Sequence, residues 1–136
     1  MQRRLITGYS PYEPVVGYSR AVVVGDHVHV SGTAPIPKDG GEPPEDAYAQ
    51  TKLCLEIVLG ALAEAGAHAG DVVRTRIFLT QVEDYEGIAR AHGEVFGDVR
   101  PASSALVVKG LIDPRWRVEI EADALIGSAR GKTSAA

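Results

Sequence analysis

Two carboxylates, Glu119 and Glu121, stand two residues apart in an apolar stretch near the end of the chain. Side chains at positions i and i+2 of a β-strand share one face, about 7 Å apart. Paired carboxylates can divide acid and base roles, because the charge of one raises the pKa of the other. Alternatively, both could form ion pairs across a sheet with Arg74, Arg76 or Arg117. For Glu121 we favour the ion pair.

The histidines and serines offer weaker chemistry. His27 and His29 share one face of a predicted strand, and a His-x-His pair can bind a metal ion. No third ligand follows at a useful spacing, so we expect no metal site. His92 falls on the apolar side of a predicted helix, where a hydrogen-bonded core histidine is expected. A triad of Ser103, His92 and Asp113 has no support from spacing, and no strained nucleophile turn is visible.

The elements that must position these residues follow from hydrophobic periodicity and turn signals. They are predicted, in chain order, as a strand at 3–6, a hairpin of strands 21–24 and 27–31, a helix at 45–65, a strand at 72–79, a helix at 84–96, an extended stretch at 103–108 and a last strand at 116–125. Helices separated by strands on one mixed sheet indicate an α/β (α+β) fold, with two helices on one face of a single-layer sheet.

Alternation along two strands predicts which residues face that helical layer. The predicted apolar face consists of Val73, Thr75, Ile77 and Leu79 on the first strand and Val118, Ile120, Ala122 and Ala124 on the second. The opposite face carries Arg74, Arg76, Phe78, Arg117, Glu119, Glu121 and Asp123. Such a density of opposite charges favours a face that meets other subunits or a ligand.

Length and composition limit the alternatives. The chain has 136 residues and a formal net charge of −4, so we expect a single domain over 1–126 and a small, polar, frayed tail over 127–136. Because no basic stripe is present, we expect no nucleic-acid partner. The single cysteine, Cys54, falls in a helical pattern and is interpreted as a core residue in a reducing compartment. No signal peptide or membrane span is apparent, so we expect a cytoplasmic protein with no membrane partner.

Two segments resemble one known family. They are Val28-His29-Val30-Ser31-Gly32 followed by Ala34-Pro35, and Arg100-Pro101-Ala102-Ser103-Ser104-Ala105 continuing to Val118-Glu119-Ile120-Glu121-Ala122. Further matches are Gly17-Tyr18, Gln50, and Gly66 followed by Asp71-Val72-Val73. The chain resembles the Rid family, also called YjgF, from about residue 15 to residue 126. Members are chorismate-mutase-like homotrimers that hydrolyse reactive imines and enamines.

The resemblance implies a cofactor-free site between subunits. Tyr18 would line the pocket, and Glu119 would orient or activate the hydrolytic water, which makes a functional role for Glu119 the favoured interpretation. The backbone near Ser31, Gly32 and Ala105 would complete the site, where N–H groups can stabilise developing negative charge.

The chain departs from the family at two positions. Ser103 stands where the deaminases carry an arginine that grips a substrate carboxylate, and a hydroxyl cannot replace that charged fork. Ala89 stands where they carry an asparagine. Arg76 or Arg100 could supply the missing charge. We therefore expect Ser103 to contact the ligand but to support poor activity on imines that carry a carboxylate.

Three functions follow from the resemblance. The first is cofactor-free hydrolysis, or deamination, of a small imine or enamine. The second is a trimeric protein that binds or senses a small metabolite without turnover, which the missing arginine fits equally well. The third is a ribonuclease or translation inhibitor, which the acidic chain disfavours. The sequence does not identify the natural substrate.

Overall fold

The computed structural model describes residues 2–129, and the prediction for 130–136 lies outside the described residues. Six strands form one mixed sheet in the order β1-β2-β3-β6-β4-β5. Their bounds are β1 Arg3–Ile6, β2 Ala21–Val24, β3 His27–Thr33, β4 Val72–Leu79, β5 Ala102–Val107 and β6 Val118–Leu125. All neighbours pair antiparallel except β4 and β5, which are parallel. The predicted single mixed sheet is confirmed.

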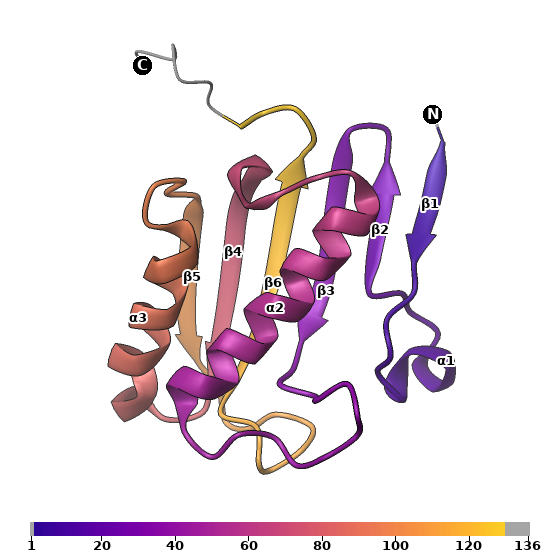
Figure 1. Ribbon diagram of the computed structural model, residues 1–136. Helices are drawn as coiled ribbons and strands as arrows, with labels where there is room; N and C mark the ends of the chain where they lie inside the picture. Colours follow the sequence, from indigo (N-terminus) through magenta and orange to yellow (C-terminus); the bar gives the residue numbers. More distant parts are fainter. Residues whose placement is uncertain (1, 130–136) are drawn as a thin grey trace.

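Two helices, α2 (Ala47–Ala65) and α3 (Tyr85–Phe96), cover the same face of this sheet, as Figure 1 shows. Asp46 caps α2, because its side chain accepts a hydrogen bond from the Ala49 N–H, and the predicted start at residue 45 is therefore two residues early. Gly66 ends α2 with φ 91°, a left-handed conformation that favours glycine.

The core lies between these helices and the sheet. The alternation predicted for the last strand is confirmed, since Val118, Ile120, Ala122 and Ala124 are all buried. From α2 the core takes Cys54, Leu55, Val58 and Leu62, and from α3 it takes Ile88 and Phe96. Tyr85, at the first turn of α3, lies outside this core and is half exposed.

One predicted strand face is wrong at its start. The pairing of β4 with β6 shifts between Val72 and Arg74, so one extra residue interrupts the alternation. As a result Val72 is buried and Val73 is exposed, the reverse of the expectation. Beyond the shift the pattern holds, with Thr75, Ile77 and Leu79 buried.

Arg117 departs from the expected charged sheet face. The last strand begins at Val118 and not at residue 116, so Arg117 precedes it. The Arg117 guanidinium binds Asp84, which precedes α3, and the Glu45 carbonyl oxygen, which precedes α2. This arginine therefore fastens the beginning of the helical layer to the sheet.

Three short helices were not predicted: α1 (Tyr12–Val16) and the 3-10 turns η1 (Ala69–Asp71) and η2 (Val82–Asp84). At the other end of the chain, Ser128 and Ala129 both hydrogen-bond to Asp71, so the first residues of the predicted tail are held against the fold. Among the described residues, no helix is long and apolar enough to cross a membrane.

Candidate functional site

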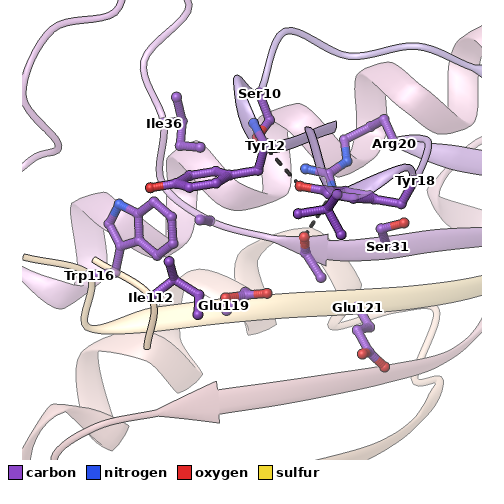
Figure 2. A pocket seen from close by; sticks show the side chains of 13 residues that line it. Ser10, Tyr12, Tyr18, Arg20, Ser31, Ile36, Ile112, Trp116, Glu119 and Glu121 are labelled. Carbon is purple, nitrogen blue, oxygen red and sulfur yellow. Dashed lines mark hydrogen bonds between the residues drawn. The ribbon is translucent and has the colours of Figure 1, made fainter. Parts of the chain in front are cut away.

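A pocket of about 520 Å³ lies where α1, the end of β3 and the start of β6 meet. Figure 2 shows side chains from these separate segments pointing into one space. The pocket is lined by Ser10, Tyr12, Val16, Tyr18, Arg20, Ser31, Gly32, Ala34, Ile36, Ile112, Trp116, Glu119 and Glu121. Four of the sequence-predicted site residues, Tyr18, Ser31, Gly32 and Glu119, therefore meet in one chain.

Glu119 is the partly buried carboxylate of this pocket. It faces away from the helical layer, because its neighbours Val118 and Ile120 fill the core. Within the described residues, no group donates a hydrogen bond or forms an ion pair with this carboxylate. Burial raises the pKa of Glu119; the positive charge of Arg20 opposes that rise, and the negative charge of Glu121 adds to it. A desolvated carboxylate without a partner can take a proton from water.

Gly32 gives the Glu119 carboxylate its room. A Cβ at position 32 would collide with Glu119 Oε1, so any larger residue would displace that carboxylate. The ladder between β3 and β6 shifts between Val30 and Thr33, a bulge that takes Ser31 and Gly32 out of regular pairing. Bulges of this kind re-aim side chains beside active sites.

Tyr18 and Arg20 form the polar end of the pocket. The Tyr18 hydroxyl lies 3.4 Å from Ser10 Oγ, and the Arg20 guanidinium lies 5.5 Å from the centre of the Tyr18 ring. Arg20 is only 4% exposed, and its Nη2 donates to the Gly32 carbonyl oxygen over 2.9 Å. The sequence reasoning missed Arg20. One signal was available: an arginine immediately before a run of apolar residues that enters the core.

The other end of the pocket is apolar. Tyr12 and Trp116 pack edge to face, with ring centres 5.9 Å apart. Ile36 and Ile112 extend this wall, and the Ile112 side chain is 78% exposed. Trp116 is buried, and its ring also lines the pocket.

Glu121 makes the predicted ion pair. Its Oε1 lies 3.5 Å from Arg76 Nη1, and the same nitrogen donates to Asp123 Oδ2 over 3.0 Å. Arg76 is thus held by two carboxylates on β6, beside the pocket but not in its lining. The two glutamates of the pocket therefore differ, since Glu121 forms an ion pair with Arg76 whereas Glu119 forms no ion pair within residues 2–129.

The remaining predicted ligand residues lie elsewhere. Ser103 and Ala105 are on the exposed edge strand β5, and Arg100 precedes that strand in a left-handed conformation with φ 56°. Ser103 pairs with Thr75, whose side chain is in the core, so Ser103 faces the helical side. Glu119 pairs with Phe78 and faces the opposite side. One chain does not bring Ser103 to the pocket.

The histidines and the cysteine considered as site residues have the contacts and burial of structural residues. His27 and His29 stack with ring centres 6.4 Å apart, and His29 Nδ1 lies 2.8 Å from Asp123 Oδ1. Among residues 2–129, no cluster of three His, Cys, Asp or Glu side chains is arranged to hold a metal ion. Cys54 is fully buried, and burial raises the pKa of its thiol, which disfavours a nucleophilic role.

Comparison with known proteins identifies relatives of this chain both in sequence and in structure. The family described as endoribonuclease L-PSP matches residues 9–126. The uncharacterized protein SCO2049 of Streptomyces coelicolor is 40% identical over 93% of this chain and 93% of its own. Rv2704 of Mycobacterium tuberculosis, described as a member of the YjgF/YER057c/UK114 family, has a TM-score of 0.84 at 41% identity and covers 92% of this chain and 100% of its own. The E. coli TdcF structure with bound serine has a TM-score of 0.76 at 29% identity, over 90% of this chain and 93% of that one.

Proposed function

The chain belongs to the endoribonuclease L-PSP family, also called the Rid or YjgF family, and we propose that it hydrolyses the C=N bond of a small imine, or of an enamine through its imine form, without a cofactor. The observation that carries this proposal is Glu119, a partly buried carboxylate with a raised pKa and no partner among the described residues, in a pocket that can hold a small molecule. Such a group can act as base and then as acid near neutral pH.

The proposed reaction needs only water and this one carboxylate. The imine enters protonated on nitrogen. Glu119 accepts a proton from water while the water oxygen bonds to the imine carbon and the C=N π electrons move to nitrogen. Glu119 then gives its proton to that nitrogen, the C–N bond breaks as the hydroxyl proton passes to Glu119, and ammonia and a carbonyl compound leave; Glu119 finally releases the proton to solvent. Because the nitrogen gains positive charge, the adjacent Glu121 carboxylate favours the charged intermediate.

A second copy of the chain is needed to complete the proposed site. Glu119 and Ser103 face opposite sides of the sheet, and β4 lies between their strands, so β5 and β6 are about 10 Å apart. All six residues of β5 are exposed, including the apolar Leu106 and Val107. An exposed apolar edge strand is normally paired or covered. We propose a homotrimer in which β5 of one subunit borders the pocket of the next.

The pocket lining defines the shape of the proposed substrate. Tyr12, Trp116 and Ile112 favour an apolar body, while Glu119 lies at the reacting end. TdcF was solved with bound serine, which supports a ligand of about amino-acid size in this chain.

A non-catalytic metabolite-binding protein is the second candidate. The observation that favours it is position 103, where a serine on β5 replaces the arginine expected from the family resemblance. Such a protein would bind a ligand in the same pocket and release it unchanged.

Steady-state and single-turnover assays separate the two candidates. Small imines formed in situ are offered to the protein, and ammonia release is measured against the uncatalysed rate. Repeated turnover supports the hydrolase. Saturable binding with no release above the uncatalysed rate across the panel would contradict it and leave the binding protein.

A further inference from the structure

A row of three hydrogen-bonding side chains lies under the exposed edge of the sheet, outside the pocket described above. Thr75 of β4 is fully buried, and its Oγ1 lies 2.8 Å from Ser103 Oγ on β5 and 2.9 Å from His92 Nε2 on α3. Thr75 and Ser103 are paired in the parallel ladder, so both side chains leave the sheet on the side of α3. The row therefore runs from the helical layer to the surface and ends at Ser103.

The hydrogen bond from Thr75 to Ser103 sets the direction of the whole row. A threonine hydroxyl has one proton, and Thr75 donates it to Ser103 Oγ. The contact between Thr75 Oγ1 and His92 Nε2 must then use a proton on the imidazole nitrogen. Nε2 carries that proton both in this neutral tautomer and in the charged ring, so the direction of the row does not depend on the charge of His92.

Ser103 is left with its own hydroxyl proton. None of the residues 2–129 accepts a hydrogen bond from it, and Ser103 is exposed. The Ser103 oxygen accepts the Thr75 proton, and its own O–H remains free to donate. Ser103 is thus prepared to donate a hydrogen bond to a group outside its own chain.

We propose that Ser103 binds an uncharged oxygen of the ligand, such as an amide or ester oxygen, and that Thr75 and His92 are the positioning residues that hold it as a donor. This inference rests on the proposed function, because Ser103 reaches the ligand only where β5 of one copy borders the pocket of another. It goes further in naming the substrate class, which is imines that have no carboxylate or whose carboxylate is replaced by an amide or ester.

The charges of the residues around Ser103 and in the pocket lining favour a ligand group that is itself uncharged. Neither Ser103 nor Thr75 can carry a charge, and burial lowers the pKa of His92, which keeps the ring neutral near neutral pH. The pocket lining holds two carboxylates, Glu119 and Glu121, and one guanidinium, Arg20, which already donates to the Gly32 carbonyl oxygen. A carboxylate on the ligand would add a third negative charge to this space, whereas a neutral oxygen needs only one donor.

Two probes that differ in one group test the preference. We use 4-methyl-2-oxopentanamide and 4-methyl-2-oxopentanoate, which share an apolar body and differ as amide and carboxylate, and measure Kd by calorimetry on the native protein. The amide should bind more tightly. Ser103→Ala should weaken amide binding about two- to tenfold, the range of one neutral hydrogen bond, and leave acid binding nearly unchanged. Ser104→Ala is the matched control, because Ser104 pairs with Arg76 and faces the other side of the sheet.

The positioning role has its own readouts. Thr75→Val should weaken amide binding as much as Ser103→Ala does. The double variant should bind the amide no more weakly than either single variant, because both substitutions interrupt the same series of hydrogen bonds. Thr75→Ser keeps the hydroxyl and should retain wild-type binding, so it remains informative if the valine variant folds poorly. Nitrogen-15 NMR of the imidazole should show His92 protonated at Nε2.

Three results would overturn the inference: acid bound as tightly as amide, amide binding unaffected by Ser103→Ala, or His92 protonated only at Nδ1. The proposed function fails separately. If no imine is turned over while the amide preference and its dependence on Ser103 remain, the inference stands and the hydrolase does not. If the native mass is that of a single chain and Ser103→Ala has no effect, both fail.

Discussion

Gly32 on β3 lies directly against the carboxylate of Glu119 on β6, so closely that a Cβ on Gly32 would overlap Glu119 Oε1. The contact joins the bulge that ends β3 to the second residue of the last strand. It explains why the Ser-Gly pair and the Glu of the C-terminal strand, about ninety residues apart, belong to one site. The glycine provides space and not a special backbone angle, because Gly32 is not among the residues with positive φ.

The first prediction follows from this contact. Gly32→Ala should displace the Glu119 carboxylate and lower kcat/KM by about 10- to 100-fold, the usual effect of misplacing a reacting group by about an ångström. Gly60→Ala is the control, since Gly60 is an exposed position of α2 with no atom near the added Cβ. That variant should keep full activity and gain about 0.5–1 kcal/mol of stability. Equal activity in the two variants would refute the role of the contact.

The second prediction concerns stability and pH. Because burial raises the pKa of Glu119 above its ordinary value of 4.5, the ionised side chain is less favourable in the folded than in the unfolded chain. Its contribution to stability is complete below about 4.5 and is lost as the pH rises through the folded value. Glu119→Gln should therefore increase the free energy of unfolding near pH 7, and this gain should shrink on acidification through the same window.

Denaturant unfolding at a series of pH values measures this difference. Asp123→Asn on the same strand is the comparison: it removes contacts with Arg76 and His29, so no gain near pH 7 is expected. A Glu119→Gln variant less stable than the wild type near pH 7 would show that the carboxylate has a stabilising partner.

Much of this architecture could be predicted from the sequence, because hydrophobic periodicity reports which face of an element is buried. The strand from Val118 alternates without interruption, and Gly66 marks the end of α2. The periodicity fails where pairing is irregular. The extra residue at Val73 depends on the register with β6, which no local pattern contains.

The site was predictable only in part. Tyr18 and Glu119 came from the family resemblance, whereas α1 was not predicted, because it spans only five residues, contains Pro14 and lies between Pro11 and Gly17. Missing α1 meant missing Tyr12 as a wall of the pocket. The Thr75 link between Ser103 and His92 required knowledge of which residue of β4 lies opposite Ser103, and that register is set by tertiary structure.

The third prediction is the oligomeric state. Light scattering coupled to size exclusion should give three times the chain mass, the mass of the proposed homotrimer in which a neighbouring subunit covers the exposed β5 edge. Leu106→Asp places a charge at an exposed position of that edge and should yield a folded species of lower mass, with little cost to the isolated chain. A wild-type monomer at micromolar concentration would contradict the shared site.

The fourth prediction concerns RNA, which the name of the family brings into question. The formal net charge is −4, and on the sheet face Arg76 is held by Glu121 and Asp123. We expect no measurable RNA binding in a titration at about 150 mM salt, where weak electrostatic contacts are screened. Tight binding under those conditions would show that a local basic surface outweighs the net charge.

The fifth prediction tests the central claim, that Glu119 activates water for C=N hydrolysis. The measurement is kcat/KM for a small apolar imine formed in situ, compared between the wild type and Glu119→Gln at about pH 7. Asp123→Asn, which removes a carboxylate of the same strand outside the pocket lining, is the control. The account predicts a loss of about a hundred- to ten-thousandfold for Glu119→Gln, the usual contribution of a general base, and a change of less than about threefold for Asp123→Asn. Turnover by Glu119→Gln at the wild-type rate would contradict it.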